Sequence, residues 1–146
     1  MISKAEAIKF FESEYDWQEP YPSGINCEFL NSGEGWGIKV YDDRLKRNEN
    51  YTHQKMAAEH GLGPEVGPKF DSGDYSCFVT EFAEPIIDTG ACVESFQYVE
   101  KNFCEEIHLA KESLKEKIGF LLDDDHAGNF GFLGEKLVCI DFGIGD

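Results

Sequence analysis

The chain has 146 residues, with 29 acidic against 13 basic side chains and a formal net charge of −16. A chain of this length buries roughly two-thirds of its unfolded surface, and its twelve phenylalanines argue against intrinsic disorder. The negative charge repels nucleic acid and anionic membrane, so we expect neither as a partner. Such a charge is typical of a solvated acidic surface, and an acidic decoy that mimics DNA stays open as an alternative.

Cysteine usage and the N-terminus bear on the compartment. The five cysteines are odd in number, and no two of them have C-x-x-C spacing, which indicates neither a disulfide framework nor a zinc site. The first eleven residues lack the apolar core of a signal peptide, and no apolar run has the length of a membrane span. We therefore expect a protein of the reducing cytoplasm.

The first expected element is a helix that begins after Ser3 and runs to about Glu14. Ser3 followed three residues later by Glu6 is typical of a capping box at a helix N-terminus. Apolar residues recur behind it at helical spacing and predict a buried stripe. The residues of that stripe are Ala5, Ile8, Phe11 and Tyr15.

Strands follow, and then a second helix. Residues 25–30 and 36–41 read as two strands joined by a glycine-containing hairpin loop. The charged stretch 42–48 is expected to be a surface connection. The helix is predicted from about 49 to 60, where Gly61 supplies a C-terminal cap.

The second half begins with one strand and ends with a hairpin. Residues 64–70 read as irregular or extended, and 75–82 read as a strand. Apolar residues at spacings of three and four predict a long helix from about 95 to 117. Two short strands, 130–133 and 136–140, close the chain around a turn at residues 134 and 135. The element order predicts an α+β fold.

Acidic and amide side chains gather around that last hairpin. The run Asp123–Asp125 lies between two apolar segments, and taken alone it could be a solvated loop. The hairpin, however, would bring Asn129 and Asp141 side by side at one end of two paired strands. Carboxylate and amide oxygens are hard ligands of the kind Mg²⁺ takes when phosphate oxygens complete its shell.

Two short motifs here resemble those of a known superfamily. Asp124-x-His126-x-x-Asn129 followed by Asp141-Phe142-Gly143 is similar to the paired motifs of the protein-kinase-like superfamily, most closely its aminoglycoside and choline kinase branch. The resemblance implies transfer of a phosphoryl group from ATP to a hydroxyl, with Mg²⁺. It implies that Asp124 accepts the proton of that hydroxyl, that His126 orders the catalytic loop, and that Asn129 and Asp141 hold the metal ions.

An upstream lysine agrees with this resemblance. Trp36–Tyr41 looks like the third strand of such a kinase, in which Lys39 reaches the α- and β-phosphates. Without the downstream motifs, an outward edge position for this lysine would be favoured. The helix glutamate that pairs with the lysine is expected to be Glu49, although counting back from residues 62–64 lands on Asn50.

The nucleotide pocket can also be assigned by the resemblance. Thr80 would line its back, and the backbone of Glu81 and Ala83 would meet the adenine edge. The alternative for this segment is an ordinary buried strand. The phosphate loop would contain Gly24, while the glycine-richer stretch 31–37 directly precedes the lysine and is expected to be a turn.

The resemblance implies a single kinase-like domain with two lobes. The N-lobe would span about 1–84, with a small antiparallel sheet, a helix and an extra N-terminal helix. The C-lobe, about 85–146, would be a reduced helical one, because the chain ends three residues after Gly143, where acceptor-binding helices would follow. A protein partner or a homodimer mate would then complete the acceptor site. The alternatives are a pseudokinase or nucleotide-binding interaction module without transfer activity, and the acidic decoy.

Overall fold

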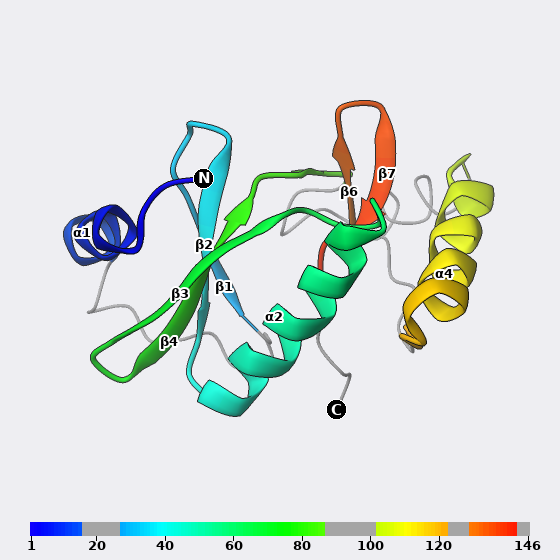
Figure 1. Ribbon diagram of the computed structural model, residues 1–146. Helices are drawn as coiled ribbons and strands as arrows, with labels where there is room; N and C mark the ends of the chain where they lie inside the picture. The colour runs from blue at the N-terminus through cyan, green and yellow to red at the C-terminus, as the bar shows by residue number, and fades with distance from the viewer. Residues whose placement is uncertain (16–26, 87–101, 123–128, 143–146) are drawn as a thin grey trace.

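The computed structural model describes residues 1–15, 27–86, 102–122 and 129–142. Within these ranges the protein is an α+β molecule, as predicted, with three helices, a four-stranded antiparallel sheet and a smaller three-stranded one (Figure 1). None of the helices in the described ranges has the length and apolar character needed to cross a membrane.

The larger sheet has the strand order β1-β2-β4-β3 and carries two helices. In chain order its elements are α1 (Lys4–Glu14), β1 (Glu28–Asn31), β2 (Trp36–Tyr41), α2 (Arg44–Glu59), β3 (Val66–Ser72) and β4 (Tyr75–Glu81). The smaller sheet has the order β5-β6-β7 and lies beside α4 (Figure 1). Its elements are β5 (Glu84–Pro85), α4 (Cys104–Ile118), β6 (Phe130–Leu133) and β7 (Lys136–Cys139).

The larger sheet is covered on both faces, which explains why its central strands are buried at nearly every position. Because side chains alternate along a strand, Ile38 and Val40 face α1 and pack with Phe11 in one buried cluster. The intervening side chains of β2 and β4 face α2, where the ring of Tyr51 meets that of Phe78 at 5.5 Å. A strand buried on both faces reads as a continuous apolar run rather than as an alternating one.

The predicted start of α1 is confirmed, but its buried stripe is not as predicted throughout. Ser3 is the N-cap, and its hydroxyl accepts a hydrogen bond from the backbone N–H of Glu6. Ala5 is exposed, and Ala7 is buried in its place. The buried stripe therefore has a spacing of four, through Ala7, Phe11 and Tyr15, which keeps one side of the helix on the sheet.

The second helix begins earlier than predicted. The carboxylate of Asp43 accepts hydrogen bonds from backbone N–H groups of the first turn, so α2 starts at Arg44 and not near residue 49. The prediction that 42–48 is a surface connection is wrong for its helical part. Arg47 is buried there, because its guanidinium donates to backbone carbonyls of β3 and β4.

The end of α2 agrees with the sequence. Gly61 has a φ of +70°, and its N–H donates to Ala58 O, while Leu62 N–H donates to Ala57 O. This pair of bonds is a Schellman motif, which needs a residue that tolerates the left-handed conformation.

Other boundaries differ by a few residues. The segment expected to be irregular or extended forms β3, and the strand expected at 25–30 is described as β1, with residues 25 and 26 outside the described ranges. The helix expected from about 95 to 117 is wrong in its start, because α4 begins at Cys104 after the non-helical Phe103; residues 95–101 lie outside the described ranges. The hairpin turn at residues 134 and 135 is confirmed by the pairing of Leu133 with Lys136.

A second buried cluster lies between the smaller sheet, α4 and the end of α2. Its buried members are Ala57, Ile107, Leu114, Phe120, Phe130, Cys139 and Phe142. Residues near the expected lobe boundary form β5, which pairs with β6. The chain thus passes from the larger sheet directly into the smaller one, and α2 contributes to the packing of both parts.

Candidate functional site

Lys39 lies at the centre of the candidate site. It stands on β2, an interior strand of the larger sheet, and only 6 % of it is exposed. Its Nζ donates to Gln54 Oε1 at 2.8 Å and to the backbone carbonyl of Ile140 at 2.6 Å. A buried ammonium is costly unless it is hydrogen-bonded, and these two bonds fix its position between α2 and the C-terminal hairpin.

Gln54 connects this lysine to the neighbouring strand β4. Its Nε2 donates to Thr80 Oγ1 at 2.7 Å and to Pro64 O at 3.0 Å. The Thr80 hydroxyl in turn donates to Glu81 O at 3.0 Å. A continuous chain of hydrogen bonds therefore runs from β4, through the buried amide on α2, to Lys39.

The hairpin of β6 and β7 places two further predicted site residues beside this chain. Its register pairs Phe130 with Cys139, and Ile140 N–H donates to Asn129 O at 2.8 Å. Asn129 and Asp141 therefore lie at the same end of the hairpin. Both are next to Ile140, whose carbonyl binds Lys39.

The charges in this region affect the pKa values of two thiols, Cys139 and Cys27. Burial raises the pKa of Cys139 to about 12; its hydrogen bond to Asp141 O opposes the rise, as does the charge of Lys39, while the charge of Asp141 adds to it. The same two charges act on Cys27, whose pKa is also raised, mainly by burial. Lys39 and Asp141 thus both lie close enough to these two thiols to affect their pKa values.

Glu49 does not pair with Lys39, so that prediction is wrong. Glu49 is exposed, and the side chain of α2 that binds the lysine is Gln54. The two positions are five residues apart, which is about 140° around a helix, so they cannot face the same strand. The neighbouring alternative, Asn50, is buried but donates to Lys46 O within its own helix.

The backbone groups of Glu81, which are expected to meet adenine, already form hydrogen bonds within the protein. Glu81 N–H donates to Glu65 O at 2.8 Å, and its carbonyl accepts the bond from Thr80. Ala83 is 7 % exposed, and its backbone N–H has no partner among the residues the structure describes. The carbonyl of Glu81 has a second lone pair, and the backbone N–H of Ala83 is a donor. One acceptor and one donor are therefore available for the edge of a planar ligand.

Three predicted site residues lie outside the described ranges. These are Asp124 and His126 of the catalytic loop and Gly24 of the phosphate loop. Their roles stay predictions from the resemblance. Gly143 lies outside as well, whereas Phe142 is described and is fully buried.

The donor set fits Mg²⁺ bound together with phosphate. Over the described ranges no group of three or more His, Cys, Asp or Glu side chains could hold a metal. Mg²⁺ in nucleotide sites needs only one or two carboxylates, since phosphates and waters supply its other ligands. Asn129 and Asp141 meet that smaller requirement.

Gln54 is the site residue that the sequence analysis missed. The buried residues of α2 are Arg47, Asn50, Gln54 and Ala57, at spacings of three and four. Three of these four are polar, so a search for apolar periodicity passes over this face. The signal that could have found Gln54 is this polar stripe, once the N-cap at Asp43 sets the start of the helix.

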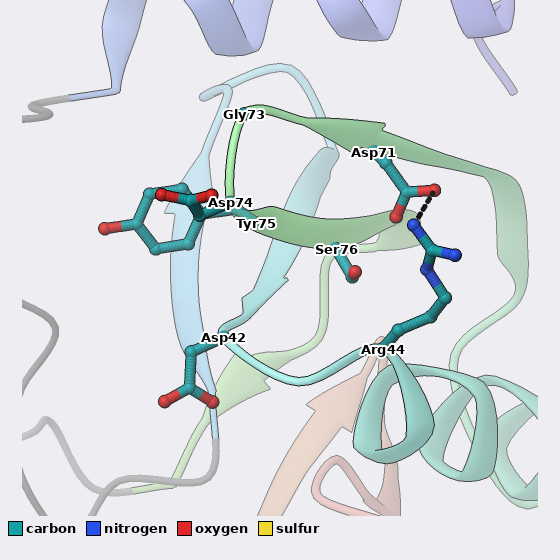
Figure 2. A pocket seen from close by; sticks show the side chains of 7 residues that line it. All are labelled: Asp42, Arg44, Asp71, Gly73, Asp74, Tyr75 and Ser76. Carbon is teal, nitrogen blue, oxygen red and sulfur yellow. Dashed lines mark ion pairs between the residues drawn. The ribbon is translucent and has the colours of Figure 1, made fainter.

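A separate hollow of about 400 Å³ lies where β2 ends and α2 begins (Figure 2). Its one ion pair joins Arg44 to Asp71 at 3.7 Å, and Arg44 is 70 % exposed, so the pair adds little stability. The carboxylates around it disfavour phosphate, and we assign it no role in the site. The lining residues are Asp42, Arg44, Asp71, Gly73, Asp74, Tyr75 and Ser76.

Comparison with models of known protein families finds none that matches this chain, and a search of the curated proteins also finds no match. A functional conclusion therefore depends on the residues and geometry described above.

Proposed function

We propose that the protein is an ATP- and Mg²⁺-dependent phosphotransferase of the protein-kinase-like type, acting on a hydroxyl. One observation carries the proposal. The buried Nζ of Lys39 is held by hydrogen bonds from two distant parts of the chain, and one of these parts leads directly into Asp141. A cation therefore contacts the backbone of the segment that carries Asp141 and pairs with Asn129, the residues expected to hold the metal.

The partners of Lys39 support binding of an anion. An ammonium has three donors, and the two acceptors bound here are both neutral. No carboxylate in the described part of the chain forms an ion pair with it. The rings of Phe78 and Phe142 lie 5.7 and 5.8 Å from Nζ and contribute weakly. An approaching phosphate would supply the missing negative charge.

The roles of the chain's residues follow from their positions. Lys39 binds phosphate oxygens, and Asn129 with Asp141 would hold Mg²⁺. When bound, the nucleotide would supply the phosphoryl group, and the metal would neutralise negative charge on its phosphates. Glu81 O and Ala83 N–H would bind the edge of adenine, and Asp124 would take up the hydroxyl proton. The acceptor would be presented by a protein partner or by a second copy of the chain.

Substitution of Lys39 tests the nucleotide site. We expect Lys39→Met to weaken binding of ATP with Mg²⁺ by at least about tenfold, because the phosphates lose their buried cation. Isothermal titration calorimetry measures the affinity. The matched control is Lys55→Met, because Lys55 is an exposed lysine of α2. This variant should bind ATP as the wild type does. Equal loss in both variants, or no binding by the wild type at millimolar ATP, would refute the proposal.

A nucleotide-binding module without transfer activity is the second candidate. It is favoured by one observation, that α2 presents the neutral Gln54 to Lys39 where the superfamily template has a glutamate. Release of phosphate from labelled ATP separates the two candidates. Activity that Asp124→Ala and Asp141→Asn both abolish supports the enzyme, whereas nucleotide binding without turnover across a screen of hydroxyl acceptors supports the module.

A further inference from the structure

Gln54 is the most deeply buried polar side chain of the site. None of its surface is exposed, and each end of its amide is used. The oxygen accepts from Lys39 Nζ at 2.8 Å, and the nitrogen donates to Thr80 Oγ1 and Pro64 O. The amide therefore has a defined orientation, because a flipped amide would direct N–H groups at the ammonium.

This arrangement suits glutamine and does not suit glutamate. A carboxylate has no donor for Pro64 O, so two acceptors would lie about 3 Å apart in a buried place. A carboxylate would also carry a negative charge at the position of Gln54 Oε1, in direct contact with Lys39. The neutral amide orients the ammonium without cancelling its charge.

We propose that Gln54 is a positioning residue that holds Lys39 through a neutral amide and so leaves the full charge of this lysine for the phosphates of the ligand. The inference rests on the proposed function, since it names how the same site selects its ligand. On this inference the site prefers ligands with highly charged phosphates. It can also bind those phosphates without a metal ion.

The dependence of affinity on ligand charge follows from this assignment. A cation with neutral partners attracts an anion more strongly as the anion gains charge, whereas a cation already paired with a carboxylate attracts it less. In the wild type with a chelator present, affinity should therefore rise from adenosine through AMP and ADP to ATP. Adenosine has no phosphate, so its affinity reports only on the adenine pocket and on correct folding.

The experiment compares Gln54→Glu with the wild type across these four ligands, by calorimetry in a chelator. We expect Gln54→Glu to lose at least about tenfold in affinity for ATP, a smaller factor for AMP, and less than about twofold for adenosine. Gln54→Leu is the matched variant without charge. It should keep the rise from AMP to ATP, because it removes the hydrogen bonds and not the charge of Lys39.

Several outcomes decide the inference. A loss graded by ligand charge in Gln54→Glu supports it. Equal or tighter binding of ATP by Gln54→Glu overturns it, and so does a loss that is the same for adenosine as for ATP. If Gln54→Glu does not fold, the wild type and Lys39→Met still decide. The rise in affinity from adenosine to ATP must be present in the wild type and absent in Lys39→Met. A wild type that binds adenosine without favouring ATP overturns this inference, whereas one that binds no nucleotide even with Mg²⁺ overturns the proposed function itself.

Discussion

Individual residues on the α2 face of the larger sheet explain why so many polar groups are tolerated in its interior. Arg47 Nη1 donates to Phe70 O at 3.0 Å and to Cys77 O at 2.9 Å, and it lies 3.3 Å from Asp71 Oδ1. Lys39 is also hydrogen-bonded, but to neutral acceptors alone. Unsatisfied buried groups of this kind would each cost about 1–3 kcal/mol, so these bonds also restrict which packing the chain can adopt.

Two buried thiols at this scale predict a loss of stability in alkali. Burial raises the pKa of Cys77 to about 12 and that of Cys139 to about 12, from 9.0 in the unfolded chain. Between these pH values the unfolded chain has released the proton and the native protein retains it. The free energy of unfolding therefore falls as pH rises, by about 1.4 kcal/mol per pH unit for each thiol.

Urea unfolding at pH 9 and pH 10.5 measures this effect. The fall between the two pH values should be smaller by about 2 kcal/mol in Cys77→Ala than in the wild type. Cys104→Ala is the control, since Cys104 is exposed. An unchanged slope in Cys77→Ala would show that burial of this thiol does not affect stability through its ionisation.

The site residues differ in how far the sequence could identify them. The sequence places Lys39 in the interior only through its resemblance motifs, which lie about a hundred residues later in the chain. Counting back from residues 62–64 leads to Asn50 and its acidic neighbour Glu49, but the residue that meets Lys39 is Gln54, about 140° further around the helix from Glu49. Gln54 was missed because the buried face of α2 is mostly polar, so apolar periodicity does not indicate it. Its role comes from three neighbours on other segments.

At the scale of elements, the N-terminal cap of α2 controls where the site helix begins. Asp43 is that cap, and its removal leaves N–H groups of the first turn without an acceptor. We expect Asp43→Ala to lower the free energy of unfolding by about 1 kcal/mol. Chemical denaturation measures it, with Asp42→Ala as the control because it removes the same charge one position earlier. Equal effects of the two substitutions would mean that charge rather than capping is responsible.

Helix ends and turns that depend on adjacent residues could be predicted from the sequence. Those that depend on contacts with distant residues were harder to predict. The Ser3 cap, the hairpin turn near Gly134 and the cap at Gly61 each have a local physical cause that the sequence displays. The start of α2 was misplaced because its charged first turns look solvated. Burial of Arg47 depends on carbonyls of β3 and β4, which adjacent residues do not reveal.

For the whole molecule, the contact between β5 and β6 is where the chain leaves the larger sheet and enters the smaller one. Gly131 stands there, and a Cβ at this position would lie 2.8 Å from Glu84 O and 3.2 Å from Ile140 Cγ2. We expect Gly131→Ala to destabilise the protein by about 1–3 kcal/mol, because the backbone oxygen cannot move away cheaply. It should also weaken ATP binding, since Ile140 holds Lys39.

Thermal denaturation and calorimetry check both effects of Gly131→Ala. Glu135→Ala, in the exposed turn of the same hairpin, is the control and should alter neither. A variant with normal ATP affinity despite lower stability would show that the position of Ile140 does not depend on this contact.

The hydrogen bond from Lys39 to Ile140 has a consequence for how the site forms. The two residues are separated by 101 positions, and closing a chain segment of that length costs about 4 kcal/mol of entropy. During synthesis on the ribosome, Lys39 cannot make this hydrogen bond until residue 140 has emerged, so the proposed phosphate site cannot form before then.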